Sequence, residues 1–69
     1  MPLTMIRTGE SGTIRRISGK DESRRFLNNL GFVEGETVTV VSYLAGNMIL
    51  NVKDTRVALD KSMAKRIIV

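Results

Sequence analysis

The sequence predicts a mainly-β protein, a small and strongly bent barrel with one short α-helix between its early strands. Three observations indicate this fold. Apolar and polar residues alternate over several short stretches, glycine-rich or Asp-containing turns separate those stretches, and one segment has a helical period instead. The 69 residues form a single predicted domain, residues 1–69. Closing the sheet would remove strand edges that invite aggregation.

The first part of the chain is expected to form two strands around a turn. We predict a short lead-in strand, a turn over Gly9 to Gly12, and a strand from Thr13 to Ser18. Ile14 and Ile17 lie three residues apart, which breaks the two-residue period of a strand. A bulge or twist would bring both side chains to one core.

The next segment has the period of a short helix. Its clustered apolar positions are Phe26, Leu27 and Leu30. Asp21 is the expected N-cap. Gly31 would follow the helix in a left-handed conformation, and Phe32 would fold back on Leu27, as in a Schellman motif. Such a short helix is marginal alone, so its apolar face is expected to cover an open end of the barrel.

The remaining residues alternate as strands separated by tight turns. The alternating apolar positions are Val38, Val40, Met48, Leu50, Val52, Val57 and Leu59. The letters AGN at residues 45–47 predict one hairpin loop, and Asp54-Thr55 a second. Residues 61–66 are expected to form one helical turn with Met63 and Ala64 inward, before a last strand at residues 67–69.

The residue types argue against catalysis and metal binding. The chain has no His and no Cys, so the usual general bases, thiol nucleophiles and transition-metal ligands are missing. An all-oxygen site from Glu34 and Glu36 is open to consideration, but their spacing does not require one. We therefore predict no enzyme activity, no catalytic residue, no cofactor and no metal site.

The charge leaves acidic partners open. Eleven Lys and Arg against seven Asp and Glu give a net charge of +4, which favours nucleic acid, anionic lipid or an acidic protein face. Proteins that bind single-stranded nucleic acid also use aromatic side chains on which the bases stack. Phe26 and Phe32 are assigned to the helix and its cap, which leaves only Tyr43. No segment resembles a signal peptide or a membrane span, so the cytoplasm is the expected location.

Two longer motifs resemble the FeoA family. The stretch FLNNLGFVEGETVTVV, residues 26–41, is similar to that family's run from a helix through two glycines into a strand. The ending VALDKSMAKRIIV, residues 57–69, is similar to the family's last strand, short turn and final strand. Two departures are Asp60, where the family commonly has a basic residue, and Asp54-Thr55, where it commonly has glycine in the turn.

The resemblance implies an SH3-like β-barrel and a non-enzymatic accessory role in ferrous-iron uptake. The implied partner is the cytosolic part of FeoB, a membrane transporter with a GTP-binding domain, whose assembly or activity the protein would modulate. The resemblance also implies no nucleic-acid partner and membrane association only through FeoB. Two alternatives stay open: a small basic barrel that binds single-stranded nucleic acid, and a ligand- or metal-sensing domain like the tails of some iron-dependent repressors.

SH3-like barrels often bind segments of other proteins beside their loops, which suggests two candidate groups. The helix with its cap contributes Arg24, Arg25 and Phe32, and the following hairpin contributes Tyr43, Leu44, Met48 and Ile49. The alternative interpretation assigns Phe32 and Leu44 to closing the core, and Met48 to filling it.

Overall fold

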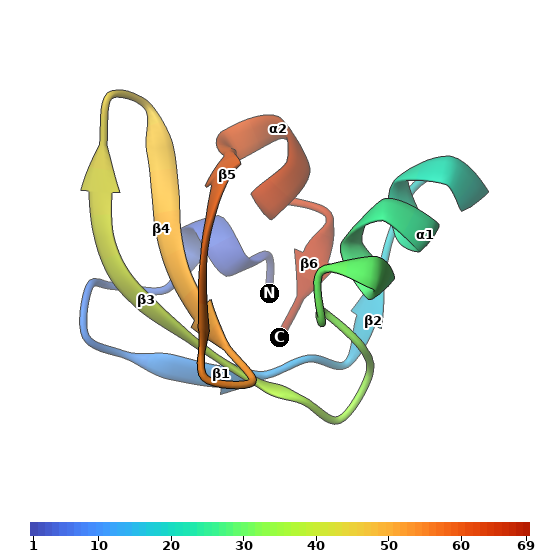
Figure 1. Cartoon of the computed structure of the whole chain (residues 1–69), viewed down its shortest axis with the longest axis horizontal. Coiled ribbons are helices and arrows are strands. Elements are labelled where there is room, and N and C mark those ends of the chain that lie inside the picture. The colour runs from blue at the N-terminus through green and yellow to red at the C-terminus, as the bar shows by residue number, and fades with distance from the viewer.

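Six short strands and three helical segments make up the structure, a computed structural model that describes residues 1–69 (Figure 1). The helical segments are η1 (Leu3–Met5), a 3₁₀ turn, α1 (Asp21–Asn29) and α2 (Lys61–Ala64). The strands are β1 (Ser11–Thr13), β2 (Arg16–Ile17), β3 (Thr37–Leu44), β4 (Asn47–Val52), β5 (Thr55–Asp60) and β6 (Ile67–Ile68). The predicted mainly-β fold with a helix between early strands is confirmed.

The strands form two antiparallel sheets, so the hydrogen-bonded ladder is not fully closed. One sheet has the order β1-β3-β4-β5, and the other pairs β2 with β6. The strand predicted from Thr13 to Ser18 is therefore wrong as a single element, because the chain bends between β1 and β2. At the bend the Arg15 N–H donates to the Ile68 carbonyl at 2.7 Å. This bend turns both Ile14 and Ile17 into the core, as predicted.

A bulge in β3 determines which side chains of the long hairpin face inward. Val38 and Val40 are buried, and the register with β4 then shifts between Val40 and Ser42. After the shift Tyr43 pairs with the buried Met48, and paired residues of adjacent strands project from the same face. The inward positions of β3 therefore change from even to odd residue numbers at the bulge.

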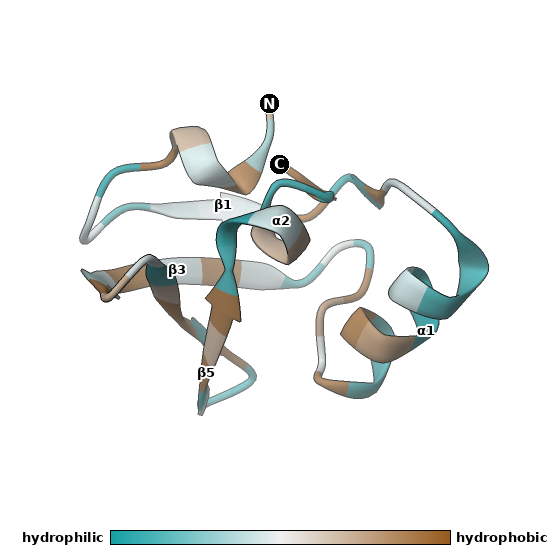
Figure 2. Ribbon diagram, turned by 90° about the horizontal axis from the view of Figure 1, so that it is seen from above, coloured by the Kyte–Doolittle hydropathy of each residue, from teal (hydrophilic) through white to brown (hydrophobic).

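One hydrophobic core lies between the sheets and the helices. Its buried residues are Leu3, Ile14, Ile17, Leu27, Phe32, Val38, Val40, Met48, Leu50, Val52, Leu59, Ala64 and Ile67. No polar or charged residue is buried. Figure 2 shows a hydrophilic first part of α1 followed by a short hydrophobic band, and the helix contributes the buried Leu27 to this core.

The C-terminal end of α1 is the predicted Schellman motif. Gly31 has a φ of +107°, and its N–H donates to the Asn28 carbonyl at 3.0 Å. The N–H of Phe32 donates to the Leu27 carbonyl at 3.0 Å. These two bonds satisfy carbonyls that the end of the helix leaves without intrahelical partners. Phe32 is thereby turned back into the core, where it is fully buried.

Two predictions about α1 are wrong. Asp21 is the first residue of the helix and not its cap; the N-cap is Lys20, which makes no side-chain capping bond, and the Asp21 carboxylate forms an ion pair with Arg24. Phe26 is 51% exposed, although it was assigned to the apolar face. Successive helical residues point about 100° apart. Leu27 takes the centre of the buried face, so Phe26 is turned toward its edge.

The N-terminal segment is a 3₁₀ turn, and the predicted lead-in strand is wrong. Leu3 is fully buried, and only an isolated bridge from Pro2 to Ile68 has strand character. The ammonium group of Met1 donates to the Val69 carbonyl at 2.7 Å, and the Val69 N–H donates to the Met1 carbonyl at 2.8 Å. The two chain ends therefore lie together (Figure 1).

Two tight turns join β3, β4 and β5. Ala45 and Gly46 form the first, with φ values of +51° and +82°, and Lys53 and Asp54 form the second, with +50° and +60°. Both φ values are positive in each turn, as type I′ hairpin loops require. The second turn therefore lies one residue before the predicted Asp54-Thr55 pair.

Asp60 caps the short helix α2. The Ser62 hydroxyl and the Met63 N–H donate to its carboxylate at 2.7 and 2.9 Å, and these bonds hold the pKa of Asp60 below its usual value. The cap accounts structurally for the acidic residue at this position. As predicted, α2 buries Ala64 and packs Met63 against the core.

Candidate functional site

The sequence-predicted site residues fall into two groups at opposite ends of the molecule. Arg24 and Arg25 are exposed on α1, whereas Tyr43, Leu44 and Ile49 belong to the β3–β4 hairpin. Figures 1 and 2 both place α1 at the right-hand side and the tip of this hairpin at the left. The two groups therefore form two separate surfaces.

Two of the predicted contact residues are in the core. Phe32 and Met48 have no solvent-exposed surface, so their side chains are corrected from partner contacts to core residues. The Schellman motif turns Phe32 inward, and Met48 lies on the buried face of β4, whereas its neighbour Ile49 lies on the other face. For Leu44 the core interpretation is wrong, because this side chain is 68% exposed.

Tyr43 is held at the rim of the hairpin by contacts with two other segments. Its hydroxyl donates to the carbonyl of Ile6, just after η1, at 3.1 Å. The Nζ of Lys61, the first residue of α2, lies 6.0 Å from the ring centroid, within range of a cation–π contact. Tyr43 as a whole residue remains 43% exposed, so an ordered aromatic side chain is available to a partner.

Leu44 and Ile49 project from the opposite face of the same hairpin. Leu44 pairs with Asn47, and Ile49 pairs with Ser42, whereas Tyr43 shares the inner face with Met48. A partner that contacts both faces of the hairpin would therefore meet apolar side chains on each face.

Met5 adds a fourth apolar residue, which the sequence did not single out. It is 65% exposed at the end of η1, one residue before the carbonyl that Tyr43 binds. We predicted a strand for this segment, and nothing in the sequence distinguished Met5 from a methionine of the core. We define Met5, Tyr43, Leu44 and Ile49 as the hairpin patch.

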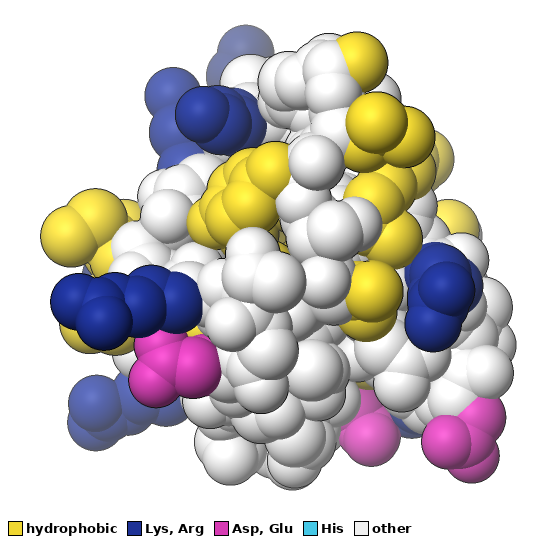
Figure 3. Space-filling model, turned by 90° about the vertical axis from the view of Figure 1, so that its left-hand side faces the viewer, with side chains coloured by type: hydrophobic (Ala, Val, Ile, Leu, Met, Phe, Trp, Pro, Cys, Tyr) yellow, Lys and Arg dark blue, Asp and Glu magenta, His cyan; other side chains and the backbone are white.

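Figure 3 views the molecule from the hairpin side. Hydrophobic side chains gather over the upper half of this face, with Lys and Arg side chains at its margins and Asp and Glu lower down. An exposed apolar surface with a charged rim is the usual composition of a protein-binding site. The arrangement can bury apolar side chains of a partner.

Neither a cluster of metal-ligating side chains nor a membrane-spanning helix is found in the structure. No group of three or more Asp, Glu, His or Cys residues is arranged to hold a metal ion. None of the helices has the length and apolar character needed to cross a bilayer.

Comparison with known proteins identifies the family. The sequence matches the FeoA domain over residues 1–69. The chain belongs to the FeoA family. A search of curated proteins gives no significant match.

Solved FeoA structures closely resemble this member of the family. A crystal structure of an iron uptake regulatory protein, FeoA, is 30% identical, with a TM-score of 0.88 over 96% of this chain and 88% of that one. FeoA of Stenotrophomonas maltophilia is 32% identical, with a TM-score of 0.88 over 100% of this chain and 88% of its own. That protein, in complex with zinc, is described as a prokaryotic SH3 domain protein and a candidate activating factor for ferrous-iron transport.

A manganese-dependent transcriptional repressor shares the fold. It is 24% identical, with a TM-score of 0.87 over 97% of this chain and 39% of the repressor. The prediction of an SH3-like fold in the FeoA family is therefore confirmed.

Proposed function

We propose that this protein is a non-enzymatic, cytoplasmic accessory factor of ferrous-iron uptake, and that its hairpin patch docks on the cytosolic part of a FeoB transporter. The FeoA match over the whole chain carries this proposal. The description of the Stenotrophomonas relative as a candidate activating factor for ferrous-iron transport supports it. The lack of His and Cys supports a binding role over a catalytic one.

The hairpin patch is the surface that the physical chemistry favours. Removing a leucine side chain fully from water stabilises a complex by about 1.5–3 kcal/mol, and Leu44 is among the most exposed apolar residues of the chain. Tyrosine is enriched among the residues that dominate binding energies. Tyr43 is already held by its bond to Ile6, so little side-chain freedom is lost on binding.

Arg24 and Arg25 are left out of this docking surface. They lie at the other end of the molecule, and exposed arginines are common on protein surfaces.

The direct test is an NMR titration of isotope-labelled protein with the cytosolic part of a cognate FeoB. We expect shift changes at the amides of Tyr43, Leu44 and Ile49. A parallel titration with single-stranded RNA addresses the nucleic-acid alternative, whose affinity would fall steeply with salt. Binding of RNA without binding of FeoB would contradict the proposed function.

A matched pair of variants locates the surface. Leu44→Ser and Phe26→Ser each remove one exposed apolar side chain, but from opposite ends of the molecule. We expect Leu44→Ser to weaken FeoB binding about tenfold, which corresponds to roughly 1.4 kcal/mol, and Phe26→Ser to leave it unchanged. Equal effects, or a larger effect of Phe26→Ser, would move the docking surface away from the hairpin patch.

A further inference from the structure

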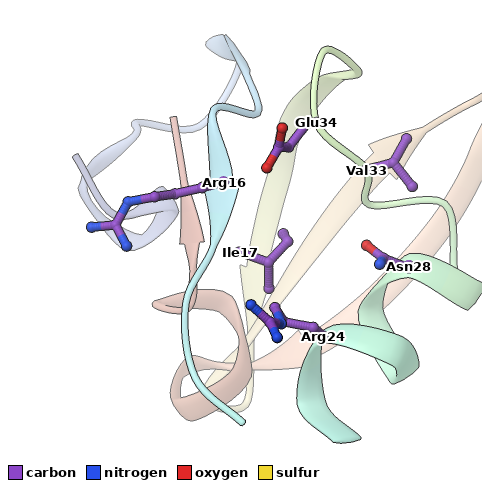
Figure 4. Close-up of a pocket in the computed structure, with 6 residues that line it drawn as sticks. All are labelled: Arg16, Ile17, Arg24, Asn28, Val33 and Glu34. Carbon is purple, nitrogen blue, oxygen red and sulfur yellow. The ribbon is translucent and has the colours of Figure 1, made fainter. Parts of the chain in front are cut away.

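A pocket of about 350 Å³ lies between β2, α1 and the loop that joins α1 to β3. Its lining residues are Arg16, Ile17, Arg24, Asn28, Val33 and Glu34. The volume is at the lower end of the range for ligand pockets. In Figure 4, Arg24 and Ile17 approach each other at the centre of the view, whereas the guanidinium group of Arg16 points away. The pocket is separate from the hairpin patch, which lies across the molecule.

The pocket combines an apolar floor with polar groups from two sides. Ile17 is only 8% exposed and Val33 is half-buried, so both can contact an apolar side chain. Arg24 and Asn28 are four residues apart on α1 and therefore share one flank of the helix. Glu34 reaches the pocket from the opposite side, on the loop after α1.

The region around this pocket carries the net charge of the whole protein. It comprises residues 15–34 together with Lys65 and Arg66. The Ser18 N–H, just after β2, donates to the Arg66 carbonyl at 2.7 Å and so holds Lys65 and Arg66 beside this region. This region has seven Lys and Arg against three Asp and Glu, a net charge of +4, which equals the net charge of the entire chain. Outside it, four Lys and Arg are balanced by four Asp and Glu. An anionic ligand is therefore attracted to this end of the molecule.

The mixed lining distinguishes between classes of anion. Arg24 already pairs with Asp21, and neither the Asn28 amide nor the Glu34 carboxylate has a hydrogen-bond partner within the protein. Phosphodiester groups offer these residues only acceptors, and any phosphate anion would be repelled by Glu34. A polypeptide offers backbone N–H donors to Glu34 and carbonyl or carboxylate acceptors to Arg24 and Asn28.

We propose that this pocket binds an extended acidic segment of another polypeptide. A carboxylate of the segment binds Arg24, an adjacent apolar side chain covers Ile17 and Val33, and a backbone N–H donates to Glu34. This site is additional to the hairpin patch, so the protein can hold a second polypeptide while the patch is occupied.

The test is an NMR titration of the full chain with the peptide acetyl-Gly-Asp-Leu-Glu-Gly-amide. We expect shift changes at the amides of Ile17, Asn28 and Val33 and none at Leu44. The neutral peptide acetyl-Gly-Asn-Leu-Gln-Gly-amide, inorganic phosphate and a deoxythymidine pentamer serve as comparison ligands. Each should bind at least fivefold more weakly.

Two neighbouring arginines provide a matched control. Arg24→Ala should weaken binding of the acidic peptide at least fivefold, and Arg25→Ala, on the same helix but outside the pocket lining, by less than twofold. Equal losses of affinity in the two variants would mean that the peptide is attracted to the basic region in general, and would overturn the proposed site. Equal or tighter binding of phosphate or the oligonucleotide would overturn the polypeptide assignment, and so would the absence of shifts at the pocket. None of these outcomes depends on FeoB.

Discussion

The turn at Ala45 and Gly46 places an ordinary residue where the backbone favours glycine or asparagine. Ala45 has a φ of +51°, and a left-handed conformation costs an L-residue about 1–2 kcal/mol. Asparagine visits this conformation more readily, and Asn-Gly is a preferred pair in type I′ loops. Ala45→Asn should therefore relieve part of this cost without changing the rest of the hairpin.

The expected gain follows from that cost. If asparagine recovers about half of it, the free energy of unfolding rises by about 0.5–1 kcal/mol. For a domain of this size, 1 kcal/mol shifts Tm by about 4–8 °C, so we expect an increase of about 2–8 °C. Ala45→Gly should gain less, because glycine also adds freedom to the unfolded chain.

Thermal unfolding followed by circular dichroism, together with urea unfolding, would measure this change. The urea midpoint should rise with an unchanged slope, since the surface exposed on unfolding stays the same. Gly46→Ala is the control of opposite sign, because a Cβ there meets no atom within 4 Å and only the φ of +82° opposes it. A neutral or destabilising Ala45→Asn with an unchanged slope would refute the assignment of strain to this turn.

Three further changes test other parts of the fold. Gly31→Ala should lower the free energy of unfolding by about 1–2 kcal/mol, because its φ of +107° opposes any L-residue while space for a Cβ is available; urea unfolding measures the loss. Gly12→Ala would place a Cβ 2.9 Å from the Cβ of Val69, so it should lower Tm, and adding Val69→Gly should restore part of the loss. Asp60→Ala should lower Tm at neutral pH. Because folding lowers the pKa of Asp60, this difference should persist in full above its ordinary value of 3.8 and shrink as pH falls through the lower folded value, which a Tm series in pH would show.

Local patterns predicted the parts of the fold that depend on neighbouring residues. The two-residue period of β4 identified its buried face, because Met48, Leu50 and Val52 all point to one side of a strand. Gly31 and Phe32 predicted the end of α1, since the Schellman motif is defined within a few residues. The family resemblance then supplied the SH3-like arrangement that these local signals did not determine.

Apart from the N-cap of α1 and the exact position of the second turn, the errors concern features that depend on distant parts of the chain. Phe26 and Leu27 are equally apolar neighbours, and only the packing of α1 decides which of them is buried. Met5 and Met48 look alike in sequence, but one ends an exposed turn and the other lies under the sheet. For the same reason, the sequence alone did not separate the buried candidates Phe32 and Met48 from the candidates on the surface. The pocket beside α1 was missed because β2, the helix and the loop form it jointly.

The meeting of the two chain ends has a consequence for how this domain can be joined to others. Because Met1 and Val69 bond to each other, both ends leave the domain at one point. A short linker could connect them, and new ends could then be opened at the tight turn between β4 and β5. Such a circular permutant should keep its fold, since no buried residue lies at the cut or the join. The same geometry would allow the domain to be inserted into a surface loop of a larger protein, because its adjacent ends would not push the two sides of that loop apart.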